Sequence, residues 1–144
     1  MNPSYIVIHH SLTEDDKLVS WQAIRNYHVN VNGWKDIGYH YGIELLGNHH
    51  EILKGRMDNE DGAHCIGYNG DSIGICVVGN FDQTAPNDAQ LALLKKLCNS
   101  LMEIYGIKIE DVIGHYETYE KRGKPIEKSC PGIRFSMKKF RLML

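Results

Sequence analysis

The sequence lacks the features that would point to a membrane or to nucleic acid. Among its 144 residues, no apolar run approaches the roughly 20 residues that a membrane-spanning helix needs. The net charge is -2, the sequence pI is about 6.4, and the one local excess of positive charge is the short run at residues 138–141. A nucleic-acid-binding protein would carry a clustered basic face instead. We therefore expect no membrane insertion and no nucleic-acid partner.

A targeting segment and a second domain are also missing from the pattern. The start of the chain, MNPS, has neither the basic residues nor the apolar centre of a signal peptide, so we expect synthesis in the cytoplasm. No repeat, low-complexity tract or linker is evident, and 144 residues is an ordinary size for one domain. We expect residues 1–144 to form a single domain, without a separate second domain, and the protein to be a monomer.

The chain contains four cysteines, which by number alone would permit two disulfides. Because no secretion signal is evident, we expect reduced thiols. Cys76 lies in an apolar run and Cys98 lies near leucines, so both are typical of small buried hydrophobic residues. Cys65 follows a histidine, and its role stays open. Cys130 differs, because it lies between Lys128 and a Pro-Gly turn in a polar stretch that is unlike a protein core.

Hydrophobic patterning predicts strands that alternate with helices. Compact β-branched and aromatic runs predict strands at residues 5–8, 41–46, 50–53, 72–78 and 112–113, with the second and third joined in a hairpin. Apolar residues at helical spacing predict helices at residues 21–32, 87–105 and within 134–142. We therefore expect an α/β fold, a single domain with a central mixed β-sheet flanked by α-helices.

Capping residues mark the ends of the two longer helices. Ser20 is the expected N-cap of the first, whose inward face should contain Trp21, Ile24, Tyr27, His28 and Val31. Asn87 and Gln90 form a capping box for the second, which Gly106 ends, and its inward face should contain Leu91, Leu94, Leu97, Leu101 and Tyr105. Between the helices, residues 55–70 have little periodicity, and a loop of that length is uncommon unless it has a function.

Two histidines and a cysteine are the main candidates for chemistry. His9 and His115 each follow a short apolar strand, and Cys130 closes the polar stretch 114–132, which reads as a loop. A His-His-Cys set binds zinc and leaves one tetrahedral position for water, as catalytic zinc sites do. Neighbours on a strand point to opposite faces, so only one of His9 and His10 can be a ligand. The alternative is that these are unrelated polar residues in loops.

Tyr39 and Lys128 have side chains that would assist a zinc ion in hydrolysis. A phenol near the metal can orient the bound water, and an ammonium can stabilise the oxyanion of a tetrahedral intermediate. No HExxH motif occurs, which excludes the helix of many metalloproteases. A rival scheme uses Cys130 as a nucleophile with His115 as its base, as in thiol hydrolases.

Six strings in sequence order make the pattern more specific. They are IVIHHSLT, GWKDIGYHYGIE, GRM, GAHCIGYNGDSIGICVVGNF, VIGHYE and KSCPG, and they span residues 6 to 131. Together they resemble the zinc-dependent N-acetylmuramoyl-L-alanine amidases, a superfamily that includes phage endolysins of the lysozyme type and peptidoglycan recognition proteins. The resemblance implies a central mixed sheet flanked by helices, with the zinc site at one edge of the sheet.

The resemblance also assigns roles to particular residues. It implies one zinc ion per chain, bound by His9, His115 and Cys130, with Tyr39 and Lys128 as catalytic residues. It implies that the groove for the glycopeptide is lined by His64 and Asn69 and bordered by Trp34 and His40. A swap of His10 for His9 as the ligand remains an alternative. The charged segment 118–126 lies between the second and third ligands and reads as a solvated loop, the alternative being contact with an acidic stem peptide.

The function implied by the resemblance is hydrolysis of peptidoglycan. Such enzymes cleave the amide between N-acetylmuramic acid and the L-alanine of the stem peptide, so the expected partner is the glycan strand with its stem peptide. Relatives that only recognise peptidoglycan typically lack the cysteine ligand, and Cys130 is present here. The alternatives are a recognition module without activity and a cytoplasmic amidase that recycles wall fragments. An endolysin-like protein would act on the wall after the membrane is permeabilised.

Overall fold

The computed structural model describes residues 1–12 and 21–144, and these residues form one sheet with helices on both sides. The strands are β1 (Tyr5–His10), β2 (Tyr41–Leu46), β3 (His49–Lys54), β4 (Ser72–Val77) and β5 (Val112–Gly114). The helices are α1 (Trp21–Asn26), the π-helical turn η1 (Tyr27–Val31), α2 (Asp88–Tyr105), the 3₁₀ turn η2 (Ile109–Asp111), α3 (His115–Lys121) and α4 (Met137–Arg141).

The sheet is mixed, and its strand order is β3-β2-β4-β1-β5. β1 runs parallel to both β4 and β5, and β2 runs parallel to β4, while β3 returns antiparallel to β2 as a hairpin. Every residue of β4 is buried, as expected for the central strand of the sheet. The α/β fold with a central mixed sheet is therefore confirmed.

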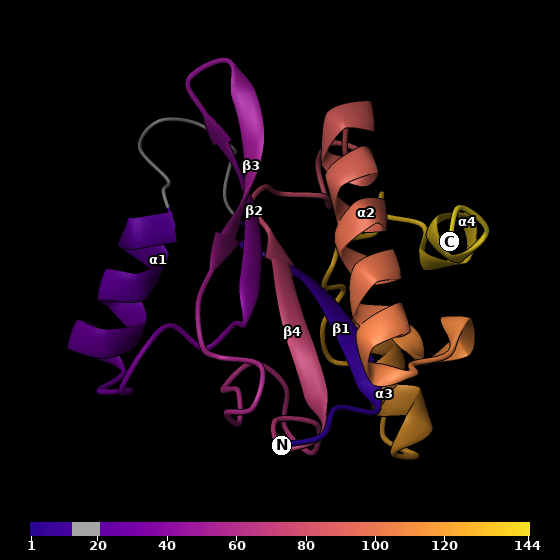
Figure 1. Ribbon diagram of the computed structural model, residues 1–144, viewed down its shortest axis with the longest axis horizontal. Helices are drawn as coiled ribbons and strands as arrows, with labels where there is room; N and C mark the ends of the chain where they lie inside the picture. Colours follow the sequence, from indigo (N-terminus) through magenta and orange to yellow (C-terminus); the bar gives the residue numbers. More distant parts are fainter. Residues whose placement is uncertain (13–20) are drawn as a thin grey trace.

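The two faces of the sheet carry different side chains of β1. Ile6 and Ile8 pack with α2 in the main hydrophobic core, whereas Val7 packs with Cys65 and Tyr68 on the other face. Figure 1 shows α2 on one side of the sheet and α1 on the other. Because side chains alternate along a strand, His9 follows Val7 onto the face away from α2.

The long helix and the cysteines agree with their predictions. Asn87 and Gln90 make both hydrogen bonds of a capping box at the start of α2, and Gly106 ends the helix with φ +68°. Its buried positions include the expected Leu94, Leu97 and Leu101. All four cysteines are free thiols, and Cys76 and Cys98 are fully buried.

The first helix differs from its prediction. Trp21 is buried and His28 is partly buried, but Tyr27 is 57% exposed and Val31 is 66% exposed, so the expected inward face is wrong at Tyr27 and Val31. After Asn26 the helix widens into π-type bonding, with the Asn32 amide donating to the Tyr27 carbonyl at 3.1 Å. A π-helical turn does not keep the 3.6-residue period on which the prediction rests. The expected N-cap at residue 20 lies outside the described residues.

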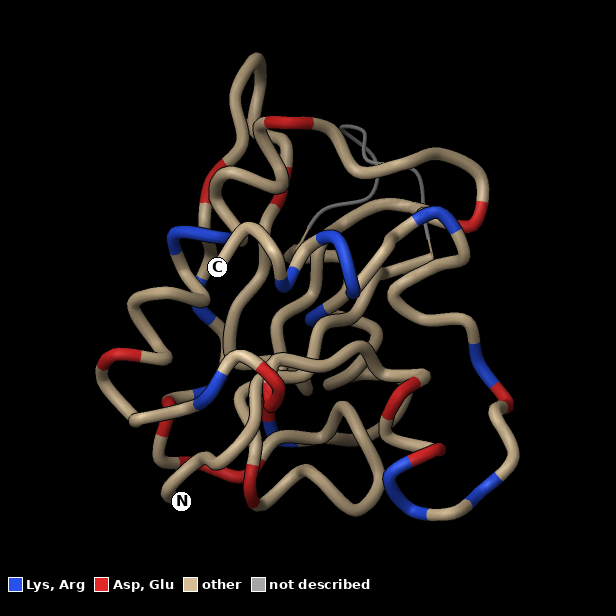
Figure 2. Tube along the Cα trace, turned by 90° about the vertical axis from the view of Figure 1, so that its right-hand side faces the viewer, with Lys and Arg blue, Asp and Glu red and all other residues tan. Residues whose placement is uncertain are grey.

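The stretch after β5 also differs, because residues 115–121 form helix α3 and not a loop. The carboxylate of Glu117 accepts a hydrogen bond from the Gly114 amide at 2.8 Å, which caps the first turn. The remaining stretch has no regular structure until α4. Figure 2 shows both basic and acidic residues along the chain on this side of the molecule. None of the described helices is long and apolar enough to cross a membrane.

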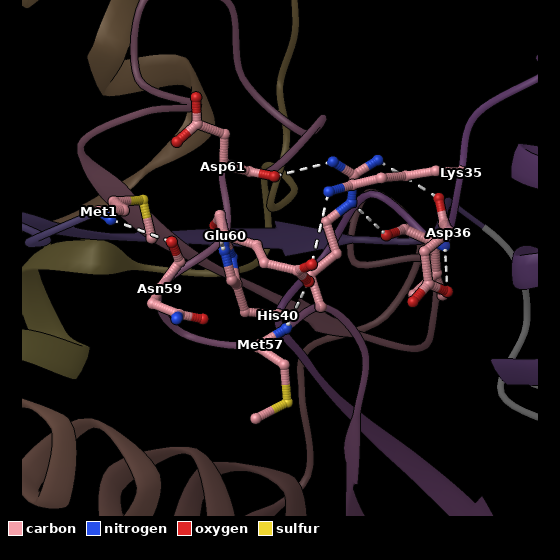
Figure 3. Close-up of polar contacts among 10 residues, drawn as sticks. Met1, Lys35, Asp36, His40, Met57, Asn59, Glu60 and Asp61 are labelled. Carbon is pink, nitrogen blue, oxygen red and sulfur yellow. Dashed lines mark hydrogen bonds and ion pairs between the residues drawn. The ribbon is translucent and has the colours of Figure 1, made fainter.

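The long loop between β3 and β4 is held by a buried arginine (Figure 3). The Arg56 guanidinium donates to the carbonyls of Ile37 at 2.9 Å, Asp61 at 2.8 Å and Asp36 at 3.4 Å. The His40 imidazole adds a contact from its Nε2 to the Glu60 carbonyl at 2.8 Å. These bonds fix the first part of the loop against the segment that precedes β2.

Candidate metal centre

Parallel strand pairing brings His9 and His115 together at one edge of the sheet. In the register of β1 and β5, Ile8 lies opposite Gly114, so the residues that follow each of them are neighbours. The two imidazole ring centroids are 4.7 Å apart. In α/β proteins, ligand-binding and catalytic sites commonly lie at the carboxyl ends of parallel strands, and His9 and His115 occupy this position.

The third candidate, Cys130, is positioned by the loop that follows α3. Its carbonyl accepts a hydrogen bond from the Tyr116 amide at 2.9 Å, and its Sγ accepts one from the His10 amide at 3.4 Å. The Asp82 carboxylate holds the same loop from the other side, accepting from the Ile133 amide at 2.9 Å and the Ser129 hydroxyl at 3.0 Å. The segment that carries the thiol is therefore held from both sides by hydrogen bonds.

The ligand atoms of His9, His115 and Cys130 all lie within 4.8 Å of one another. The Nδ1 of His9 is 3.6 Å from the Cys130 Sγ. Zinc bonds of 2.0–2.3 Å in a tetrahedron place neighbouring ligand atoms about 3.5 Å apart, so this spacing suits a zinc ion. His10 is directed elsewhere, because its Nδ1 accepts a hydrogen bond from the Phe81 amide at 3.1 Å.

The three side chains have the protonation states of an unloaded metal site. Burial lowers the pKa of His9 well below its usual value, and the neighbouring His64 and His115 lower it further. Burial, with Lys128 and Arg122, lowers the pKa of His115 to about 4. Both imidazoles are therefore neutral near pH 7 and offer lone pairs. Burial raises the pKa of the Cys130 thiol to about 12, and a bound cation would favour the thiolate instead. The donor set fits a zinc ion.

The expected catalytic residues border this cluster. The Tyr39 ring lies 5.2 Å from the His9 ring, between centroids, and burial raises the pKa of the phenol well above 10, so it stays a hydrogen-bond donor. Lys128 is exposed, and its positive charge lowers the pKa of both His9 and His115. A cavity of about 480 Å³ is lined by Tyr39, Lys128 and all three candidate ligands.

A second cavity of about 600 Å³ adjoins the first and shares His115, Lys128 and Trp34 with it. Of the residues expected to line a groove, Trp34, His64 and Asn69 line this cavity. The fourth, His40, is fully buried, and its Nδ1 accepts a hydrogen bond from the Gly74 amide at 3.0 Å. His40 thus lies beneath the groove and holds β4, so contact of its side chain with a ligand stays a prediction that this placement does not favour.

Two residues at the site were not singled out from the sequence. His28 lines the smaller cavity, accepts the Gly38 amide on its Nδ1 at 2.9 Å and lies 4.7 Å from the Trp34 ring, between centroids. From the sequence it was expected only on the inward face of a regular helix, without a role at the site. Asp82, which holds the loop of Cys130, belongs to no motif, and no sequence signal marks it.

A comparison with known families places the chain in one of them. The family model described as N-acetylmuramoyl-L-alanine amidase matches residues 1–133. The chain belongs to this amidase family. The peptidoglycan-recognition protein SC2 of Drosophila melanogaster is 31% identical over 134 residues, covering 90% of this chain and 68% of that protein. The endolysin of Escherichia phage T7 is 35% identical over 105 residues, covering 69% of this chain and 67% of the endolysin.

Solved structures of family members agree in fold. The N-acetylmuramoyl-L-alanine amidase LysC from Clostridium intestinale superposes with a TM-score of 0.80 at 30% identity, covering 99% of this chain and 85% of LysC. Peptidoglycan recognition protein LE was solved with tracheal cytotoxin, a monomeric diaminopimelic acid-type peptidoglycan. It gives a TM-score of 0.76 at 27% identity, covering 96% of this chain and 79% of that protein. Proteins named as amidases and proteins named as peptidoglycan recognition proteins therefore share this fold.

Proposed function

We propose that this chain hydrolyses the amide bond between N-acetylmuramic acid and the L-alanine of the stem peptide, with one zinc ion held by His9, His115 and Cys130. The observation that carries the proposal is the convergence of two neutral imidazoles and one thiol within 4.8 Å, in a cavity that Tyr39 and Lys128 also line. A recognition module that only binds peptidoglycan has no chemical need for this complete set.

Zinc bound at this site would supply a Lewis acid that polarises the amide carbonyl and lowers the pKa of water. The chain's own groups have separate tasks. The Lys128 ammonium would stabilise the negative charge that develops on the carbonyl oxygen. The Tyr39 phenol, kept protonated by burial, would donate a hydrogen bond that orients the attacking water. The larger cavity beside His115 would receive the stem peptide.

A thiol mechanism with Cys130 as nucleophile has less support. A nucleophilic cysteine needs a lowered thiol pKa, and burial raises that of Cys130 to about 12. The imidazole nitrogen facing its Sγ at 3.6 Å belongs to His9, not to the expected base His115. Burial and position therefore both favour a metal ligand over a nucleophile.

Release of stem peptide from purified sacculi tests the proposal. The zinc-loaded protein should release peptides that begin with L-alanine, lose this activity when zinc is chelated, and regain it when zinc is added back. A Cys130→Ser variant should release none and bind zinc more weakly. Intact binding to sacculi without release would show a recognition module, and activity that survives chelation would show a thiol enzyme.

Two biological settings for the amidase differ in the size of the preferred substrate. An endolysin-like enzyme acts on intact sacculi, whereas a recycling amidase acts on soluble wall fragments. The similarity to phage endolysins favours the first, in which the protein is made in the cytoplasm and reaches the wall after the membrane is permeabilised. Initial rates of amide cleavage, measured on equal amounts of intact sacculi and of soluble muropeptide, distinguish the two settings. Separately, sedimentation of the purified protein tests the expected monomer.

A further inference from the structure

The side of His9 that faces away from the candidate ligands is occupied by a second histidine. This second histidine is His64. The Nε2 of His9 lies 2.9 Å from the Nδ1 of His64, and the two rings meet edge to face with their centroids 5.0 Å apart. The other nitrogen of His64, Nε2, lies 3.3 Å from the hydroxyl of the buried Ser72. That hydroxyl lies 2.6 Å from the main-chain carbonyl of Tyr68. The four groups form one continuous row of hydrogen bonds.

The direction of this row is fixed at its far end. A carbonyl oxygen only accepts, so the short 2.6 Å contact commits the single proton of the Ser72 hydroxyl to Tyr68. The hydroxyl must then accept from His64, which places the proton of that neutral ring on Nε2 and leaves its Nδ1 bare. The proton between the two rings must therefore come from His9 Nε2.

The consequence for His9 concerns the nitrogen that faces the metal centre. A neutral imidazole carries one proton, and if His9 carries it on Nε2, its Nδ1 is an unprotonated lone pair. This Nδ1 is the atom that lies 3.6 Å from the Cys130 Sγ. If His9 carried its proton on Nδ1 instead, an N–H would point toward the metal centre. The bare Nε2 of His9 would then face the bare Nδ1 of His64, and neither could donate.

The backbone around His64 holds its ring in this place. The Asn69 side-chain oxygen accepts the amides of His64 at 2.8 Å and of Cys65 at 2.9 Å. A Cβ added at Gly62 would lie 2.4 Å from the His64 ring, and one added at Gly74 would lie 2.6 Å from it. The two glycines therefore make the room that the ring occupies.

We propose that His64 is a positioning residue, and that the row from Tyr68 through Ser72 and His64 sets the tautomer of His9 so that a bare Nδ1 awaits the metal before it binds. This inference rests on the proposed function only in taking the metal to be zinc. Groups that hydrogen-bond to the far nitrogen of a metal-binding histidine and hold it in one tautomer change metal affinity by roughly tenfold to a hundredfold.

Nitrogen NMR of the metal-free protein, with ¹⁵N-labelled histidine and at near-neutral pH, tests the tautomer directly. The account predicts that His9 and His64 both carry their proton on Nε2. In a Ser72→Ala variant, His64 loses the hydroxyl acceptor and keeps only its contact with the main chain of residue 72, so the preference for a proton on Nε2 should weaken at both histidines. A metal-free wild type in which His9 is protonated on Nδ1 would overturn the proposal, whatever the activity of the enzyme.

Zinc affinity, measured by competition with a chromophoric chelator, gives the second readout. His64→Leu should weaken zinc binding by roughly tenfold or more. His64→Asn keeps an acceptor oxygen near the place of Nδ1, so it should recover most of that loss. Tyr68→Phe, which removes only a hydroxyl and keeps the carbonyl, is the matched control and should bind zinc as the wild type does.

The outcomes separate this inference from the proposed amidase activity. If the wild type binds zinc with the expected tautomers but cleaves no wall amide, the proposed function fails and the positioning role stands. If the wild type is an active zinc amidase and His64→Leu binds zinc with wild-type affinity, the positioning role fails alone. Should His64→Leu not fold, the tautomers of the wild type and the affinity of His64→Asn still decide.

Discussion

The ion pair between Glu117 and Arg141 offers a quantitative test of how the metal centre is supported. The two side chains meet in a bidentate contact, with nitrogen–oxygen distances of 2.8 and 2.7 Å and side-chain exposures of 15% and 24%. The Arg141 guanidinium also donates to the Val112 carbonyl at 3.0 Å. The pair ties α4 to β5 and to the first turn of α3, which begins with His115.

Glu117→Gln removes the charge while keeping an oxygen for the Gly114 amide. Hydrogen bonds to charged groups contribute about 1.5–3 kcal/mol each, and partial exposure reduces this through screening. We expect the free energy of unfolding to fall by about 2–3 kcal/mol in total, because the half-buried guanidinium loses its counter-charge. For a chain of this length, that loss lowers the melting temperature by roughly 5–10 °C.

Urea denaturation of Glu117→Gln, Arg141→Gln and the double variant gives the coupling free energy of the pair. Lys35→Gln is the control, because the Lys35–Glu60 pair at 3.5 Å is far more exposed, at 62% and 41%, and its loss should change stability by about 0.5 kcal/mol or less. A coupling near zero for Glu117 and Arg141, or equal losses in Lys35→Gln and Glu117→Gln, would refute the reasoning.

Three further substitutions test the site itself. Tyr39→Phe should cut turnover by about a hundredfold while the zinc content stays at one per chain, and full activity would remove Tyr39 from the mechanism. Lys128→Gln should lower kcat by about a hundredfold without loss of zinc, measured by stem-peptide release; an effect on KM alone would contradict its role on the oxyanion. Gly74→Ala should destabilise the fold by about 1–3 kcal/mol, because its Cβ would lie 2.6 Å from the His64 ring. In urea denaturation Gly70→Ala, where the nearest atom is 3.5 Å away, is the control, and equal stability of the two variants would show that the His64 ring gives way.

Much of the sheet could be predicted from the sequence, because its strands are short apolar runs bounded by glycine and polar residues. The alternation along β1 predicted that His9 and His10 face different ways, but only the structure shows that His9 faces the candidate ligands. The helices that follow β1 and β5 were predicted less accurately than the strands. A π-helical turn breaks the period of α1 after Asn26, and α3 depends on a cap and an ion pair from the distant Arg141.

The candidate metal centre divides in the same way. Histidines after two apolar strands indicated a site because parallel strands end at one edge, but the third ligand needs a loop that α3 and Asp82 position. Zinc chemistry suggested roles for Tyr39 and Lys128, and the resemblance to a family assigned them as catalytic residues. The contacts of His64 with His9 and Ser72 join residues 55 and 8 positions apart in the chain, and no pattern in one sequence reveals such a row.

The most direct test of the central claim combines metal content with the release of stem peptide by one purified sample. The account predicts one zinc ion per chain, amide cleavage that disappears when zinc is chelated and returns when zinc is restored, and loss of both in Cys130→Ser. A protein that carries no metal and still cleaves the amide at its full rate would contradict the account.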